Sequence, residues 1–293
     1  MKYLFIITGL VALYTAGCQS PATKKEKAAA RKAFINEDKL EKIWVTNPVL
    51  RTPESVLYDA QRNVIYVSNI NGKPSVKDGD GFISRLSPDG KVTDKKWVTG
   101  LDAPKGLGIY GDKLYVSDIH SLVVISIPEK KVLKRYTDSL ASFLNDVAVD
   151  DEGNVYVSDM GASAVYRLHG GIFEKWIRDK RLNGPNGLYV EDDRLLAGLK
   201  DRIVSIDLQS REIKDFILHT GSIDGLEADG RGNYLISDWS GHVNLVSPGK
   251  KKVLLLNTTA IGMQAADIDF VKSSGMLLVP TFGNNRVVAY RYK

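Results

Sequence analysis

A pattern of about forty residues recurs six times after residue 53, and it constrains the fold of this chain more than any other feature. Each copy begins with a polar or small residue and continues with a short apolar stretch, a turn and a second β-rich run. The copies start at Glu54, Lys105, Asn145, Asn186, Asp224 and Ala266. The intervals between these starts are 51, 40, 41, 38 and 42 residues, and the long one holds a Gly- and Asp-rich insertion at 71–81. A repeat of this length predicts an array or ring of similar supersecondary units.

Each copy contains four segments with strand character. The first two flank a turn rich in Asp, Gly and Asn, which is typical of a β-hairpin. Two further strand-like segments follow, such as those at 202–208 and 214–218 in the fourth copy. Four strands in about forty residues are typical of a β-propeller blade. No segment after residue 41 shows a sustained helical period, so a βαβ fold is not expected.

The ends of the chain complement each other. The last copy lacks a fourth strand because the chain ends at Lys293, while the segment KIWVT at 42–46 matches KKWVT at 95–99, the fourth strand of the first copy. We therefore predict an all-β, six-bladed β-propeller over residues 41–293, its ring closed by the N-terminal strand. Three tryptophans fall at equivalent outer-strand positions, which predicts packing between blades. They are Trp44, Trp97 and Trp176.

The first forty residues have a different character. A positive start at Lys2 precedes an apolar run at 3–14 and the small residues Thr15-Ala16-Gly17, which is the pattern of a secretory signal. Cys18 follows directly, and this arrangement resembles a bacterial lipobox. We expect a lipoprotein signal peptide at 1–17, lipidation of Cys18 and a charged tether at 18–40. A soluble exported protein whose signal happens to contain a cysteine is the alternative.

Charge separates these two regions. The chain has 40 Lys and Arg against 35 Asp and Glu, a net charge of +5, of which residues 1–40 carry +4. The nearly neutral body gives no support for nucleic-acid binding. The single cysteine excludes disulfides within the chain and thiolate metal clusters. We expect a monomer on the bacterial cell envelope, lipid-anchored on the periplasmic or outer side of a membrane and touching that membrane through the anchor only.

The first residues of the six copies are the candidate site. The innermost strands of a propeller line its central channel, so these residues should converge on one axis. Two carboxylates, Glu54 and Asp224, and two carboxamides, Asn145 and Asn186, would then form a set of oxygen ligands. Such a set suits one divalent cation, Ca²⁺ first and Mg²⁺ or Mn²⁺ less readily. The alternative is that these side chains cap strand starts by bonding local amides. Lys105 either points out of the channel or pairs with a carboxylate.

Four short motifs support a resemblance over roughly residues 45–293. They are Pro53-Glu54-Ser55-Val56, Asn145-Asp146, Pro185-Asn186-Gly187-Leu188 and Asp224-Gly225-Leu226. In order and spacing they resemble motifs of the gluconolactonase, senescence marker protein and luciferin-regenerating family. The resemblance implies a six-bladed propeller with one divalent metal in the channel and lactone hydrolysis. It implies metal ligation by Glu54, Asn186 and Asp224, contact of Asn145 with metal-bound water or substrate, and a general base at Asp224.

The chain departs from that family at the substrate pocket. Sugar-lactone members have an Arg two residues before the Asn equivalent to Asn145, where this chain has Phe143. With Met160 nearby, Phe143 predicts an apolar mouth, and Asn145, Phe143 and Lys105 are the candidate substrate contacts. The expected function is metal-dependent hydrolysis of a lactone or ester with an altered pocket. The alternative is a non-catalytic propeller, similar to NHL-type domains, that binds a protein or glycan ligand at its channel mouth.

One further set of polar residues recurs outside the ring. Asp118, Asp159 and Asp238 each follow the second strand of a copy. Carboxylates at such positions commonly accept hydrogen bonds from nearby backbone amides, so we expect these residues to fasten loops.

Overall fold

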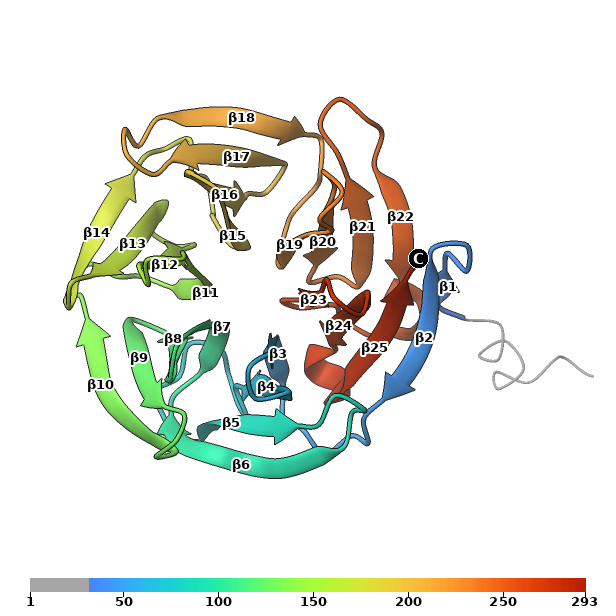
Figure 1. Cartoon of the computed structure of the whole chain (residues 1–293), viewed down its shortest axis with the longest axis horizontal. Helices are drawn as coiled ribbons and strands as arrows, with labels where there is room; N and C mark the ends of the chain where they lie inside the picture. The colour runs from blue at the N-terminus through green and yellow to red at the C-terminus, as the bar shows by residue number, and fades with distance from the viewer. Residues whose placement is uncertain (1–31) are drawn as a thin grey trace, which may run out of the picture. The chain divides into compact units, whose positions relative to one another are not determined.

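The computed structural model describes residues 32–293, and the predicted signal peptide and Cys18 lie outside this range. Residues Ala33–Lys293 form one compact unit. Its strands fall into six antiparallel sheets arranged in a ring around a common centre, which confirms the predicted six-bladed propeller (Figure 1). Within residues 32–293 no helix has the length and apolar character that a membrane crossing requires.

The strands of the first four blades follow chain order from the centre of the ring outward (Figure 1). The first contains β3 (Pro53–Asp59), β4 (Val64–Asn69), β5 (Gly81–Leu86) and β6 (Val92–Leu101). The second contains β7 (Pro104–Tyr110), β8 (Lys113–Asp118), β9 (Ser121–Ser126) and β10 (Lys131–Thr137). The third contains β11 (Leu144–Val149), β12 (Val155–Asp159), β13 (Ala164–His169) and β14 (Ile172–Arg178). The fourth contains β15 (Leu188–Glu191), β16 (Arg194–Gly198), β17 (Arg202–Asp207) and β18 (Ile213–Leu218).

The last two blades take strands from both ends of the described chain. The fifth contains β19 (Leu226–Ala228), β20 (Tyr234–Asp238), β21 (His242–Val246), β22 (Val253–Asn257) and, as a fifth strand, β1 (Phe34–Ile35). The sixth contains β23 (Asp269–Val271), β24 (Met276–Pro280), β25 (Val287–Tyr292) and β2 (Leu40–Val45). Short 3-10 helices follow β22 and β24, η1 (Thr259–Ile261) and η2 (Phe282–Asn284).

Ring closure works as the sequence predicted, with one addition. β2 pairs antiparallel with β25, so the N-terminal strand completes the last blade and joins the two ends of the ring. β1 pairs with β22 through Phe34 opposite Asn257 and Ile35 opposite Leu256. The blade structure therefore begins at residue 34, inside the segment that was expected to be a tether. A strand of two residues is too short to show a periodicity in the sequence.

The aromatic residues of the outer strands pack between blades, as predicted. The ring centroids of Trp97 and Tyr66 lie 4.9 Å apart, and Trp97 shares an apolar cluster with Leu107 of the second blade. The ring centroids of Trp176 and Tyr156 lie 5.2 Å apart, and Trp176 shares an apolar cluster with Leu188 of the fourth blade. At these two interfaces, neighbouring sheets therefore bury an outer-strand tryptophan together with aliphatic side chains of the next blade.

Candidate functional site

The six repeat-start residues, here called the channel ring, occupy equivalent places at the start of the innermost strand of each blade. Glu54, Lys105 and Asn145 lie within β3, β7 and β11, and the other three lie just before β15, β19 and β23. Figure 1 shows these six strands closest to the centre. The channel ring consists of Glu54, Lys105, Asn145, Asn186, Asp224 and Ala266.

A β-bulge sets the direction of the ring side chains. The pairing register shifts between Pro53 and Val56 in the first blade and between Leu144 and Val147 in the third. A bulge leaves residues of the inner strand outside the regular ladder and re-aims their side chains. Ring residues sit in these bulges, so they are not held in the inter-blade core as their strand neighbours are.

Serines of the second strands hold this irregular backbone. Ser237 Oγ accepts a 2.8 Å hydrogen bond from the Gly225 amide and donates one of 2.7 Å to the Ala266 carbonyl. Ser158 Oγ likewise accepts a 2.8 Å hydrogen bond from the Asp146 amide. Each serine hydroxyl thus accepts a hydrogen bond from an inner-strand backbone amide of its own blade. The Ser237 hydroxyl also bonds the carbonyl of Ala266, the ring residue of the next blade. The channel ring is therefore rigidly supported.

Asn186 and Asp224 are in direct contact. Asn186 Nδ2 donates a 2.8 Å hydrogen bond to Asp224 Oδ1, which joins the fourth blade to the fifth. Asp224 is 5% exposed, and burial raises its pKa to about 7, against the opposing effect of the Asn186 hydrogen bond. A carboxyl group with this pKa exchanges protons near neutral pH, which is what a general base or acid requires.

Glu54 is the second buried carboxyl group of the channel ring. It is 5% exposed, and its Oε2 has no hydrogen-bond partner among the described residues. Burial raises the pKa of Glu54 well above its usual range, and repulsion from Asp224 raises it further. An unpartnered carboxylate oxygen beside a second carboxylate is unfavourable unless a proton or a cation compensates the charge.

Lys105 points into the protein and not into solvent. It is 1% exposed, its Nζ donates a 3.0 Å hydrogen bond to the Ala103 carbonyl, and it lies 4.5 Å from the centroid of the Phe143 ring. Burial lowers the pKa of Lys105, and the charge of Glu54 opposes this effect.

The Met160 amide donates a 3.0 Å hydrogen bond to the Phe143 carbonyl, so these two predicted mouth residues are neighbours.

Two aspartates next to the ring were not recognised from the sequence. Asp146 Oδ2 accepts a 2.6 Å hydrogen bond from the Leu188 amide, and Asp267 Oδ2 accepts one of 2.6 Å from Ser55 Oγ. Each carboxylate thus reaches the inner strand of the following blade. Burial raises the pKa of Asp146 to about 6, and it raises that of Asp267 well above the usual range. The sequence feature that could have identified Asp146 and Asp267 is their position directly after the ring residues Asn145 and Ala266.

The donor set fits one oxygen-preferring divalent cation. Glu54 has a buried carboxylate oxygen without a partner among the described residues, and the charge of Asp224 raises the pKa of Glu54 further. No salt bridge between the described residues neutralises either carboxylate. Asn186 Nδ2 donates its hydrogen bond to Asp224, so the Asn186 Oδ1 is the atom of this side chain that could bind a cation. Among residues 32–293 no three His, Cys, Asp or Glu side chains are grouped for metal binding, so amide oxygens would have to complete the set.

The mouth above the ring has exposed apolar side chains. Trp239, 51% exposed, follows β20 and packs edge-on at 5.5 Å against Phe282 of η2. Phe282 in turn contacts a buried cluster formed by Ile70, Ala103 and Ile119 of the first two blades. Aromatic and aliphatic groups from several blades therefore meet at this end of the propeller. The contact of Trp239 with Phe282 joins the loops that follow the second strands of the fifth and sixth blades.

The predicted loop carboxylates do fasten loops. Asp118 accepts hydrogen bonds from the amides of Asp102 and Ala103 and pairs with Arg135 at 3.0 Å. Asp159 accepts from four backbone amides, those of Ser142, Phe143, Gly161 and Ala162. Asp238 accepts from the amides of Gly241 and His242. Asp159 thereby positions the loop that carries Phe143.

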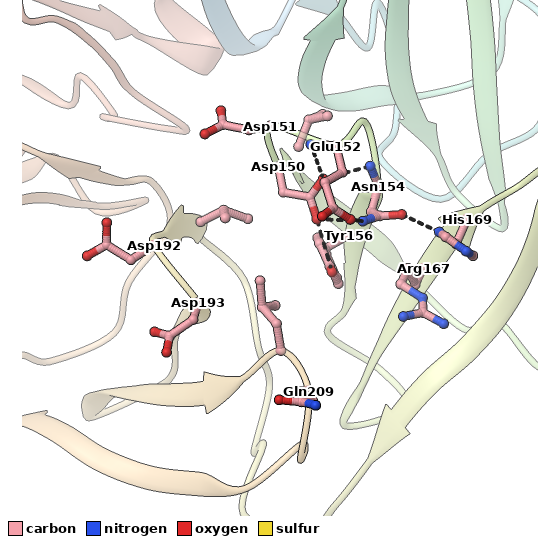
Figure 2. A pocket seen from close by; sticks show the side chains of 13 residues that line it. Asp150, Asp151, Glu152, Asn154, Tyr156, Arg167, His169, Asp192, Asp193 and Gln209 are labelled. Carbon is pink, nitrogen blue, oxygen red and sulfur yellow. Dashed lines mark hydrogen bonds between the residues drawn. The ribbon is translucent and has the colours of Figure 1, made fainter.

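A cavity of about 600 Å³ lies away from the ring, at the hairpin turns that end β11 and β15 (Figure 2). Its acidic lining residues are Asp150, Asp151, Glu152, Asp192 and Asp193. Asp150 is already engaged by the amides of Glu152 and Asn154, which shape the turn. No channel-ring residue lines this cavity, so it is separate from the candidate site.

Comparison with known proteins supports the fold alone. No family model matches the sequence, and no curated protein matches it significantly. Virginiamycin B lyase from Staphylococcus aureus, a catalytically inactive variant solved with quinupristin, is similar at a TM-score of 0.61 and 14% identity, with 87% of this chain and 99% of that chain covered. A streptogramin B lyase gives 0.62 and 11%, with 89% and 98% covered. The WD40 propeller domain of Doa1 gives 0.58 and 12%, with 80% and 77% covered.

Proposed function

We propose that this protein is an exported, lipid-anchored hydrolase that opens a small lactone or ester with the help of one divalent cation. The observation that carries the proposal is a pair of buried carboxyl groups in the channel ring that repel each other, Glu54 and Asp224. Asp224 accepts the hydrogen bond of Asn186, and Glu54 keeps one carboxylate oxygen without a partner among the described residues. The similar fold of virginiamycin B lyase, which was solved with the small molecule quinupristin, agrees with small-molecule chemistry in such a propeller. Lipid attachment at Cys18 and a place on the cell envelope are proposed from the sequence pattern.

Glu54, Asn186 and Asp224 would hold the cation, and because all these ligands are oxygens the proposed ion is a hard divalent cation, Ca²⁺ first and Mg²⁺ or Mn²⁺ less readily. The chemistry that a cation supplies in such a site is polarisation of an acyl oxygen and compensation of carboxylate charge. Asp224 takes a proton from the attacking water, since the cation that it helps to hold keeps its carboxylate ionised at neutral pH. The same proton passes to the departing alkoxide when the acyl C–O bond breaks, which returns Asp224 to its starting state.

The remaining candidate residues orient the substrate. Asn145 is buried at its ring position and offers an amide that can bond an acyl or alkoxyl oxygen. Phe143 presents an aromatic face instead of the cationic group that a sugar acid would need. The preferred substrate is therefore a lactone or ester with an apolar substituent and no carboxylate.

The experiment is a hydrolysis panel of apolar lactones and aryl esters, measured on the full-length protein with added Ca²⁺ and with chelator. Asp224→Asn keeps the size of the side chain and should lower kcat by about 10²- to 10⁴-fold, which is the usual contribution of a general base. Asp193→Asn changes a carboxylate of the separate cavity and is the matched control. The proposal fails if chelator and Asp224→Asn both leave hydrolysis unchanged, or if no substrate of the panel is hydrolysed.

A second candidate function is binding of a protein or glycan at the channel mouth without catalysis. The exposed Trp239, 51% accessible, and the exposed Met160, 39% accessible, favour it. Tryptophan offers a flat apolar surface on which a sugar ring or an apolar side chain can pack. Quenching of Trp239 fluorescence by a ligand, lost in Trp239→Ala and accompanied by no hydrolysis in the panel above, would select this function.

A further inference from the structure

The two ends of the propeller can be told apart by strand direction. The strands of a blade alternate in direction, so the connections after the second and fourth strands lie at the end where the inner strands begin. The chain passes from the fourth strand of one blade to the first strand of the next at this same end, which we call the mouth face. The opposite end, formed by the turns after the first and third strands, is here called the turn face.

Exposed apolar side chains in the loops are confined to the mouth face. Six loops of this face each expose one large apolar residue, from 36% for Val49 to 67% for Leu140. The six residues are Val49, Val76, Leu140, Met160, Trp239 and Ile261. Among residues 32–293 no loop of the turn face exposes such a residue, and those nearest to it, such as Ile172, lie on strands of the rim. Single exposed apolar residues are common on proteins, but their confinement to one end indicates a contact surface.

The loops of the mouth face hold these side chains in place. The Leu140 amide donates a 2.7 Å hydrogen bond to Asp138 Oδ1. The ring of Trp239 packs edge-on against Phe282, with 5.5 Å between the centroids, and Ile261 ends the 3-10 helix η1. The exposed apolar groups are therefore presented by ordered backbone, and a partner would not have to order them on contact.

The chain enters the propeller at the mouth face. β1 begins at Phe34, which lies opposite Asn257, the last residue of β22. Because β22 is the fourth strand of its sheet, its last residue lies at the mouth face. The 16 residues from Cys18 to Ala33 can span at most about 55 Å. A lipid on Cys18 would therefore keep the mouth face close to the membrane that holds it.

Charge does not divide the two ends in this way. The turn face carries the carboxylates around the cavity of Figure 2, and it also carries three consecutive lysines in the turn before β22. These lysines are Lys250, Lys251 and Lys252. What distinguishes the mouth face is thus apolar surface, and the partner that it fits is apolar as well. Such a contact should depend little on salt or on anionic lipid.

We propose that the mouth face is a lipid-docking surface, on which the propeller rests against a phospholipid bilayer with its turn face toward the solvent. Leu140, Trp239 and Ile261 enter the boundary between head groups and acyl chains, where tryptophan and aliphatic side chains are favoured. The lipid anchor of the proposed function brings this face to the membrane, and the inference rests on that part of the proposed function and not on hydrolysis.

The test measures which face of the propeller touches lipid. The full-length protein is bound to phosphatidylcholine vesicles with brominated acyl chains, which quench tryptophan at short range, and unbound protein is removed by flotation. The emission of Trp239 is the difference between the unmodified protein and Trp239→Phe, since Trp97 and Trp176 are buried. Most of this emission should be lost in brominated vesicles relative to unbrominated ones, and added salt should not restore it.

Matched variants at the other end provide the control. Ile172, 65% exposed, begins the outer strand β14 beside the turn face. In a Trp239→Phe background, the tryptophan of Ile172→Trp should keep its emission in brominated vesicles. Leu140→Asp combined with Ile261→Asp should reduce the quenching of Trp239, because each places a charge in the apolar contact, whereas Ile172→Asp should leave it unchanged.

The outcomes separate this inference from the proposed function. It is overturned if the protein does not float with the vesicles, if bound Trp239 keeps its emission, or if the Ile172→Trp variant is quenched equally. Bound protein with an unquenched Trp239 would leave the mouth face free for the protein or glycan of the second candidate function. The intact mass of the same sample shows whether Cys18 carries lipid, so quenching without lipidation would support the docking surface and contradict the anchor alone.

Discussion

Asn186 Nδ2 donates a 2.8 Å hydrogen bond to Asp224 Oδ1, and this bond links the ring positions of the fourth and fifth blades. It stabilises the ionised form of Asp224, whereas burial stabilises the protonated form and raises the pKa to about 7. The loss of hydration, together with repulsion from Asp146 and Asp238, therefore opposes this hydrogen bond in setting the pH at which the carboxyl group titrates.

Removing the hydrogen bond from Asn186 should raise the pKa of Asp224. In Asn186→Leu the amide is lost while the side-chain volume is kept, and we expect the pKa of Asp224 to rise by about one to two units, given the worth of hydrogen bonds to charged groups. Titration of the labelled Asp224 carboxyl carbon by NMR measures it directly. A pKa that stays at or below about 7 in the variant would contradict the role given to Asn186.

The stability of the propeller should fall as pH rises through neutrality. The folded pKa values are about 7 for Asp224 and about 6 for Asp146 and Asp269, all above the ordinary 3.8. The folded state therefore holds more protons than the unfolded state between these values, and stability present below pH 4 is lost as pH passes 6 to 7. Thermal melts in chelator should give a lower melting temperature at pH 8 than at pH 5.

Two variants sharpen this pH experiment. Asp224→Asn removes one of the buried acids, so it should raise the melting temperature at pH 8 and reduce the difference between pH 5 and pH 8. Asp193→Asn, in the cavity of Figure 2, should leave the profile unchanged. A melting temperature that increases from pH 5 to pH 8 in the unmodified protein is the opposite result.

A glycine beside the ring is required for close approach of two inner strands. A Cβ added at Gly225 would lie 2.4 Å from the Ile268 amide nitrogen and 2.9 Å from Asp267 Oδ1. Gly225→Ala should therefore lower the free energy of unfolding by about 1–3 kcal/mol through overpacking. At Gly72 the nearest atom is the Asp78 carboxylate oxygen at 3.3 Å, in an exposed loop. Gly72→Ala should change the free energy of unfolding by less than about 0.5 kcal/mol, and equal effects in chemical denaturation would refute the packing argument.

The closure of the ring rests on β2. Trp44 is half-buried there, donates a 3.0 Å hydrogen bond to the Pro88 carbonyl and packs against Leu50 and its neighbours in the cluster between the sixth and first blades. Trp44→Ala should lower the free energy of unfolding by about 2–4 kcal/mol, somewhat less than for a fully buried aromatic. The adjacent Ile43 is 41% exposed, so Ile43→Ala should have a much smaller effect in the same urea titration. Comparable losses for both variants would argue against closure through Trp44.

Much of the architecture was predictable because it repeats. Six copies of one pattern revealed six blades, and the match between 42–46 and 95–99 revealed which strand closes the ring. Asp118, Asp159 and Asp238 recurred at one place in the pattern, so their common role in fastening loops followed. Features that occur only once could not be predicted from the repeat, and the pairing of β1 with the fifth blade is one of them.

The candidate site was only half predictable. The channel-ring positions followed from the repeat, but Asp146 and Asp267 lie one residue further on, where most copies have Gly or Ser. Their carboxylates meet backbone and hydroxyl donors of a neighbouring blade, Leu188 and Ser55, that are distant in the sequence. The orientation of Lys105 was equally undecided, since a strand residue in a bulge can face the channel, a neighbouring blade or solvent.

The sequence by itself determined the number of blades, the strand that seals them and the positions that line the channel, because regular hydrophobic alternation and spacing encode strands and their order. The tertiary structure alone decided which side chains share hydrogen bonds and which are excluded from water. The bond from Asn186 to Asp224, the enclosure of Lys105 beside Phe143 and the unpartnered oxygen of Glu54 all arise between blades. Such properties depend on distances and burial in three dimensions, and these set the pKa of every acid and base in the channel.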